Sequence, residues 1–122
     1  MADAKRDLFV KEFGAQLRKL KSAEKVTREV LKDLSRSLLL ALHGKDGILY
    51  GDIQYVNAVL PVLTPVNKKV FVLYMKHFTG FHFDDGLNVF TKKSKKRADE
   101  AQQNALALLE DPNQNIWTWA DR

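Results

Sequence analysis

The stretch FHFDDGLNVFT, residues 81–91, decides the fold predicted for this chain. Apolar and polar side chains alternate on both sides of an Asp-Gly pair at positions 85 and 86, which is typical of a β-hairpin closed by a two-residue type I′ turn. In that register Phe81 lies opposite Phe90, Phe83 lies opposite Asn88, and the three phenylalanines share one face. Because a two-stranded hairpin is only marginally stable by itself, we expect at least two of these rings to pack into the core.

Helical periodicity dominates the sequence on either side of the hairpin. Apolar residues recur every three to four positions across residues 4–43, which predicts N-terminal helices, and across residues 52–78, which predicts a further helical segment. A last helix is predicted over residues 94–110, followed by a tail at residues 111–122. The expectation is a single domain of the α+β class over all 122 residues, mainly helical with one β-hairpin.

Residues that cap helices mark the predicted boundaries. Ser22 and Asp52 each precede an apolar segment with helical spacing, and we expect both to act as N-caps. Thr64 followed by Pro65 predicts another helix start, because proline is tolerated at the first helical position. Pro112 is expected to end the last helix.

The composition is that of an ordinary globular protein, with 45% apolar and 29% charged residues. Cysteine is absent, which excludes disulfide scaffolds, cysteine-ligated metal sites and thiol catalysis. The longest apolar runs are too short to span a membrane, and Met1 is followed by charged residues rather than by the hydrophobic stretch of a signal peptide. We therefore expect no membrane association and a cytoplasmic location.

Charge is segregated along the chain, whose net charge is +5. Between residues 68 and 97, eight cations accompany two carboxylates, whereas the residues after position 97 carry five carboxylates and a single arginine. The eight cations are Lys68, Lys69, Lys76, Lys92, Lys93, Lys95, Lys96 and Arg97. This pattern favours a polyanionic partner for the basic segment.

Five of these cations lie within residues 92–97, where the hairpin leads into the last helix. Cations in a first helical turn oppose the helix dipole by about 0.3–1 kcal/mol each, so local stability does not explain them. Backbone N–H groups and cations at such a start suit a bound phosphate, and the adjacent Phe90 offers a ring on which a base can stack. Stacking favours a single strand, because base faces in a duplex are covered. The alternative is a solvated turn whose lysines provide solubility.

Trp117 and Trp119 lie near the end of the chain. In an extended tail they point the same way, and we expect them to clamp the tail to its own domain or to a neighbouring subunit. Base stacking and contact with another protein are the alternatives. The tryptophans and the high apolar content also predict a homo-oligomer, because the apolar surface exceeds what one small core covers.

Catalysis has little basis in the sequence. His77, His82 and Asp84 are close along the chain, but a metal site needs three convergent ligands, and these residues are predicted on different elements and faces. Asp46 and Asp52 could serve a nuclease, although Asp52 is explained as a cap. No phosphate-binding loop, nucleophile elbow or zinc-finger spacing is present. We expect no enzyme, no cofactor and no metal site.

The C-terminal part of the sequence resembles small orphan proteins encoded by tailed phages. The resemblance lies in the run FVLYMKHF at residues 71–78, the hairpin sequence, the following Lys92 and Lys93 and a closing tryptophan. The similarity covers about the C-terminal half of the chain. Within this group, the chain is similar to phage single-stranded-DNA-binding proteins that act as cofactors of a phage RNA polymerase. The resemblance implies a mainly helical fold distinct from the OB-fold barrel, a preference for single-stranded DNA, assembly into an oligomer and a location in the host cytoplasm.

The principal hypothesis is sequence-tolerant binding of single-stranded DNA, in transcription or replication, by a protein that holds melted DNA and recruits a polymerase. The cations of residues 92–97, with Lys68, Lys69 and Lys76, are expected to hold phosphates, and Phe90 is expected to hold bases. The acidic C-terminal region is a candidate docking surface for a phage RNA polymerase, and it can compete with DNA for the lysines.

Two alternatives belong to other classes of protein. The first is a protein–protein interaction module, such as a phage inhibitor of a host enzyme, in which the phenylalanines and tryptophans are hot spots. The second is a small metal-dependent nuclease that uses His82 or Asp84.

Overall fold

The computed structural model describes residues 2–45, 47–49, 51–93 and 95–121. Its helices are α1 (Ala2–Lys19), α2 (Glu24–His43), α3 (Ile53–Val59), the 3₁₀ helix η1 (Leu60–Val62), α4 (Pro65–Thr79), α5 (Lys95–Glu110) and α6 (Ile116–Ala120). Its strands are β1 (Phe81–Asp84) and β2 (Val89–Lys93), which pair as a two-stranded antiparallel sheet. The predicted α+β class, mainly helical with one hairpin, is confirmed.

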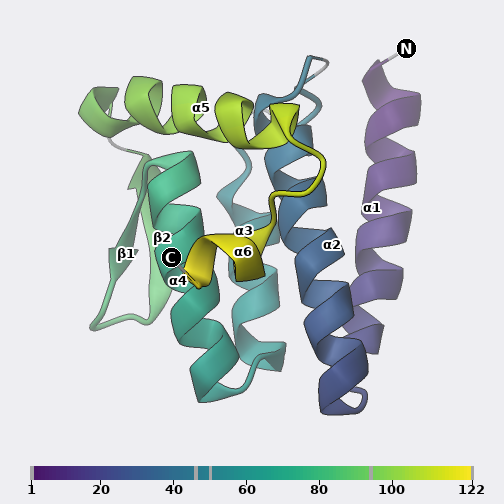
Figure 1. Cartoon of the computed structure of the whole chain (residues 1–122). Coiled ribbons are helices and arrows are strands. Elements are labelled where there is room, and N and C mark those ends of the chain that lie inside the picture. The colour runs from purple at the N-terminus through teal and green to yellow at the C-terminus, as the bar shows by residue number, and fades with distance from the viewer. Residues whose placement is uncertain (1, 46, 50, 94, 122) are drawn as a thin grey trace.

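The helices form a bundle that α5 closes at one end (Figure 1). Helix α2 contacts α1, α4, α5 and α6, so it is the central element of the bundle. Helix α5 crosses the end of α4 from which the hairpin leaves, and the short α6 lies across α2 and α4. Within the described part of the chain, no helix is long and apolar enough to cross a lipid bilayer.

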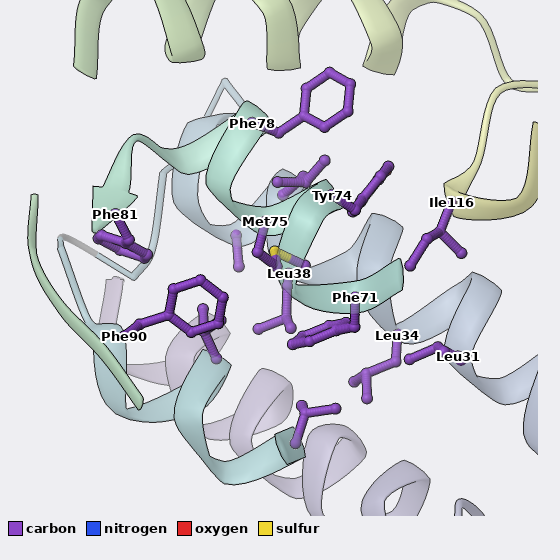
Figure 2. Packing of buried hydrophobic residues seen from close by; sticks show 14 of the residues in the cluster. Leu31, Leu34, Leu38, Phe71, Tyr74, Met75, Phe78, Phe81, Phe90 and Ile116 are labelled. Carbon is purple, nitrogen blue, oxygen red and sulfur yellow. The ribbon is translucent and has the colours of Figure 1, made fainter. Parts of the chain in front are cut away.

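The core lies between α4 and α2 (Figure 2). Helix α4 buries residues spaced three or four positions apart, which places them on one face: Phe71, Tyr74, Met75 and Phe78. Helix α2 meets this face with Leu31, Leu34 and Leu38, none of which is exposed. Burial of each such side chain contributes about 1.5–3 kcal/mol. This packing fixes α4, so its opposite face is held toward solvent.

The hairpin is present, but the predicted register is wrong. Phe83 lies opposite Phe90 and Phe81 lies opposite Lys93, with an irregularity between these two pairs. The turn takes four residues rather than two because Asp84 closes it twice, its Oδ1 accepting from the backbone N–H of Leu87 at 2.9 Å and its carbonyl from that of Asn88 at 2.7 Å. Asn88 adopts the left-handed conformation, with φ at 59°, and asparagine tolerates that region better than most residues.

Asn57 of α3 holds the second strand of the hairpin. Its side-chain Nδ2 donates to the carbonyl of Phe90 at 3.0 Å, and its Oδ1 accepts from the Phe90 backbone N–H at 2.7 Å. The Phe90 ring points into the core beside Phe81, and each residue keeps only 2% of its surface exposed. The expectation that at least two of the three phenylalanines are core residues is confirmed.

The predicted helix caps have mixed outcomes. Thr64 caps α4, accepting from the backbone of Asn67, and Pro65 occupies the first turn, as predicted. Ser22 is not the cap of α2, which begins later and has no side-chain cap, so this prediction is wrong. Asp52 precedes α3, but its carboxylate caps no backbone group of α3 and accepts from Arg6 at 2.7 Å instead.

The chain after α5 is not the extended tail that we predicted. Asn115 and Thr118 form a reciprocal capping box, in which each side chain bonds to the backbone of the other, and this starts α6. Ile116 inserts into the core with none of its surface exposed. The acidic residues after α5 therefore belong to a packed segment, and the prediction that this segment clamps to its own domain is confirmed. Competition between these carboxylates and DNA for the lysines stays a prediction.

Arg36 of α2 anchors the segment between α5 and α6. Its guanidinium donates to the carbonyls of Leu109 at 2.9 Å, Asp111 at 3.2 Å and Gln114 at 2.9 Å. Carbonyls at the end of a helix have no partner within the helix, so one planar cation with several donors suits this place well. The position of α6 thus depends on a residue far away in the sequence.

Candidate nucleic-acid interface

The predicted basic residues whose side chains are described fall on α4 and α5. Lys69 and Lys76 are exposed on α4, and Lys68 beside them is half-buried. The first turn of α5 contributes Lys96 and Arg97, both exposed. The side chains of three further predicted cations lie outside the described residues, and Ser94 lies outside them altogether; these cations are Lys92, Lys93 and Lys95.

Gly80 brings the two helices together. It ends α4 in the left-handed conformation, with φ at 76°, and its backbone N–H donates to the carbonyl of Lys76 at 3.2 Å. A Cβ atom at this position would lie 3.2 Å from backbone atoms of Arg97 and Ala98. Only glycine combines this φ with so close a contact, and the contact places the start of α5 against the end of α4.

A surface hollow is lined by residues of α4, α5 and α6. It has a volume of about 390 Å³, and we call it the outer hollow. Two cations and one carboxylate line it together with apolar, polar and aromatic groups: Leu73, Lys76, His77, Arg97, Glu100, Ala101, Asn104 and Trp119. Lys76 and Arg97, which are far apart in sequence, therefore lie at one site with an aromatic ring.

A second hollow of about 350 Å³ adjoins the first, and we call it the inner hollow. The two hollows share His77, Asn104 and Trp119 as a common wall. Beyond this wall, the lining comes from α4, from α5 and from the loop before α6: Phe78, Ala107, Leu108, Asp111 and Gln114. The described lining thus changes from one with two cations and a carboxylate to one with a single exposed carboxylate, Asp111, beside neutral polar and apolar groups.

Trp119 forms part of both hollows. Its ring packs edge-on against Tyr74, with 5.5 Å between centroids, and against Phe78 at 5.9 Å. His77 lies 5.8 Å from the same ring at a tilt of 36°. These contacts fix the indole while leaving it half-buried at the surface.

Trp117 has a different environment. Its indole Nε1 donates to the carbonyl of Arg28 at 2.9 Å, and the Arg28 guanidinium carbon lies 4.0 Å above the centre of its ring. Both the polar group and one ring face therefore have partners within the protein. Of the two tryptophans, Trp119 is the one that lines a hollow together with Lys76 and Arg97.

The expectation that Phe90 presents a ring for base stacking is wrong. Phe90 is 2% exposed, and Asn57 holds its backbone against α3. The hairpin alternation had placed Phe90 on the phenylalanine face, of which at least two rings were expected in the core, and Phe90 is one of the two rings that are buried. Sequence reasoning also missed Asn104 and Glu100, since neither has a distinctive spacing.

The solvent-facing side of α4 extends the outer hollow along the helix. Residues spaced three or four positions apart form this side, with Val66 75% and Leu73 48% exposed. Lys69 lies between these two residues and Lys76 follows Leu73, so cations alternate with apolar side chains along this side of the helix. A surface of this kind can contact both the phosphates and the apolar parts of a polymer.

Where the chain is described, its carboxylates and histidines form none of the metal sites considered from the sequence. Across the described ranges, no three histidine, aspartate or glutamate side chains are placed to bind a metal ion together, so His77, His82 and Asp84 make no such group. Asp52 is paired with Arg6, and Asp46 lies outside the described residues.

Comparisons with protein-family models, curated proteins and solved structures give no match for this chain. The resemblance to phage proteins therefore stays a prediction, and the function of the surface has to be argued from its own groups. Those groups are cations from two helices, a fixed indole and an adjoining polar hollow.

Proposed function

We propose that this protein binds single-stranded DNA through the α4–α5 surface, which we define as Lys69, Leu73, Lys76, Arg97 and Trp119. Binding is sequence-tolerant, because phosphate contacts provide most of the affinity and a fixed indole can stack on any base. The observation that carries the proposal is that Lys76 and Arg97, from different helices, line one hollow with Trp119.

The electrostatics of α5 support an anionic ligand. The first turn of this helix has no acidic residue and contains Lys96 and Arg97. Each cation there costs about 0.3–1 kcal/mol against the helix dipole, and a bound phosphate offsets that cost. Glu100 in the outer hollow weakens the field without reversing it, since two cations line the same hollow.

The recessed position of Trp119 favours a single strand over a duplex. The ring lies where three helices meet and is only partly exposed. The bases of a duplex are stacked inward and cannot reach such a ring, whereas a single strand can turn a base toward it. The proposed role is to hold melted DNA during transcription or replication, and recruitment of a phage RNA polymerase and assembly into a homo-oligomer belong to the same hypothesis.

A protein–protein interaction module is the second candidate. Val66 and Leu73 are exposed on the same face of α4 as the lysines, and exposed apolar residues among cations also suit an acidic protein partner. The two candidates differ in their response to DNA, because a protein-binding module has only weak polycation binding to offer an oligonucleotide.

Fluorescence anisotropy with labelled oligothymidine tests the proposal. Four phosphate contacts, by the three cations of this surface and by Lys96 beside Arg97, predict a log–log dependence of affinity on salt concentration with a slope of about −3. The double variant Lys76→Gln/Arg97→Gln should reduce the slope to about half, because it removes two of these contacts. The matched control is Lys11→Gln/Arg18→Gln, which removes two exposed cations from α1 on the other side of α2.

The outcomes separate the candidates. Binding that depends on salt and weakens only in the α4–α5 double variant supports the proposal. Equal loss in the two double variants, or an affinity that does not respond to salt, contradicts it. Titrations with single-stranded RNA and duplex DNA then establish the preference among nucleic acids.

A further inference from the structure

The inner hollow has the features of a site for a small planar group. Its volume of about 350 Å³ falls within the range of roughly 300–1,000 Å³ that is usual for ligand sites. Phe78 and Leu108, both buried, supply apolar contacts, while Asn104, Asp111 and Gln114 make the lining largely polar. Aromatic and apolar side chains beside convergent polar groups are typical of sites that bind an aromatic ring and read its edge.

The inner hollow is within reach of a strand held at the outer one. The two share Trp119, His77 and Asn104, and the outer hollow carries Lys76 and Arg97. A nucleotide whose phosphate lies between these cations can direct its base past the indole into the adjoining space. The cations of the outer hollow and the Asp111 carboxylate of the inner hollow thus match the phosphate and the base of one nucleotide.

Asp111 determines which base fits. Among the described residues that line the inner hollow, it supplies the one carboxylate, and a carboxylate accepts hydrogen bonds without donating any. The Watson–Crick edge of guanine presents two neighbouring N–H donors, which can pair with both carboxylate oxygens. Adenine and cytosine present one amino group beside an acceptor, and thymine presents one N–H between two carbonyls. Guanine is therefore the best match and thymine the worst.

The carboxylate is held in place before any ligand binds. Its Oδ1 accepts from the backbone N–H of Asn113 at 2.9 Å. The carbonyl of Asp111 accepts from Arg36 at 3.2 Å and from the backbone N–H of Gln114 at 3.1 Å. A residue fixed on both its backbone and its side chain loses little conformational entropy on binding.

We propose that the inner hollow binds one unstacked guanine base of the bound strand, with Asp111 accepting from its Watson–Crick edge and the Asn104 amide available to its carbonyl oxygen. This inference rests on the proposed binding of single-stranded DNA and adds a base preference at a single nucleotide. Affinity along the rest of the strand stays independent of sequence.

The test compares labelled oligothymidine with the same oligonucleotide carrying one central guanine. The guanine should tighten binding about tenfold, which is in the lower part of the range for a bidentate base contact. A central adenine or cytosine should give less than half of this gain in free energy. The Asp111→Asn variant, which keeps the Oδ1 acceptor for Asn113, should lose the guanine advantage and bind oligothymidine as the control does.

The matched control is Glu110→Gln, which removes the same charge from the neighbouring exposed position outside the hollow. Asn104→Ala is a second variant, expected to reduce the guanine advantage about threefold by removing one hydrogen bond. A guanine advantage that persists in Asp111→Asn, or no advantage in the natural protein, overturns this inference while oligothymidine binding still supports the proposed function. Failure to bind either oligonucleotide overturns both.

Discussion

The two sides of α6 hold one tryptophan each and treat them differently. On the α2 side, the Arg28 guanidinium covers one face of the Trp117 ring and the Arg28 carbonyl accepts from the indole N–H. The groups of this indole that could bind a ligand therefore already have partners within the protein. On the α4 side, Trp119 packs edge-on against Tyr74 and Phe78 but still borders two hollows and two cations. The comparison teaches that neighbouring groups, rather than residue type or exposure alone, distinguish a structural ring from one available to a ligand.

Removal of Arg36, which anchors the segment that carries both tryptophans, should have the largest effect on stability. Arg36→Met leaves the part-buried carbonyls of Leu109 and Gln114 and the exposed carbonyl of Asp111 without their charged donor and should lower the free energy of unfolding by about 3 kcal/mol. Urea denaturation measures this change. Arg28→Met is the control, because it removes only the cation above Trp117 and should cost about 0.5–1 kcal/mol. Equal losses in the two variants would show that Arg36 does not anchor the segment.

The contact between Gly80 and the start of α5, which supports the Trp119 side, should give the next largest change in stability. Gly80→Ala forces a side chain into the left-handed conformation and against the backbone of α5, so we expect a loss of about 2 kcal/mol in stability. Gly14→Ala is the matched control: it lies within α1 with ample room for a Cβ and should stabilise by about 0.5–1 kcal/mol. A neutral Gly80→Ala, measured by thermal and urea unfolding, would contradict the close contact between α4 and α5.

The functional difference between the tryptophans can be measured directly. Trp119→Leu should weaken oligothymidine binding about tenfold, within the range for loss of one stacked base. Trp117→Phe should leave the affinity within about twofold while lowering stability by about 1 kcal/mol, because it removes the hydrogen bond to Arg28. Anisotropy and urea denaturation on both variants give the two quantities. Reversed affinities would place DNA on the α2 side of α6.

Tyr74, which packs against Trp119, should make the stability of the protein depend on pH. Burial raises the pKa of this phenol, and the nearby Arg36 opposes the shift only partly. Because the folded-state pKa lies above the unfolded value near 10, the protein keeps its full stability below that pH. Above it, only the unfolded state loses the proton, so the free energy of unfolding falls by about 1.4 kcal/mol per pH unit.

The Tyr74→Phe variant isolates this contribution. Among the described residues, the Tyr74 hydroxyl is buried and has no hydrogen-bond partner, so its removal should change stability at neutral pH by less than about 1 kcal/mol. The difference between the two proteins should then grow with pH above 10, with the variant the more stable. Parallel stability curves from pH 8 to 11 would contradict the burial of the phenol.

Glu100 should give the smallest effect. Its carboxylate lines the outer hollow with Lys76 and Arg97, and exposed charges of this kind interact by only about 0.2–1 kcal/mol. Glu100→Gln should tighten DNA binding by about twofold or less at low salt and should have no effect at high salt. Weaker binding in the variant would indicate that the carboxylate positions a cation.

The helices before α6 and the existence of the hairpin follow from local sequence rules, whereas α6 lies in the segment that was expected to be an extended tail. The Thr64-Pro65 start of α4 and the helical spacing of its buried face were predictable because they depend on neighbours along the chain. The hairpin register was not, since the choice of Asn88 for the left-handed position depends on how Asp84 closes the turn. The burial of Phe90 depends on Asn57, which is distant in sequence.

The candidate site was predictable only in part. Charge counting identified Lys76 and Arg97, but their meeting requires the contact between Gly80 and the start of α5. Trp119 was singled out for its residue type, yet its location depends on the capping box at Asn115 and on Arg36 of α2. Contacts between distant elements, rather than any local pattern, create both hollows.

Asn57 has a consequence for how copies of this protein can associate. Its side chain imitates a neighbouring strand and occupies the outward N–H and carbonyl of Phe90. An unpaired strand edge is a template for edge-to-edge aggregation, and this amide occupies the outer edge of β2 near its start, at Phe90. A second copy therefore cannot extend the sheet at Phe90 without displacing the Asn57 amide.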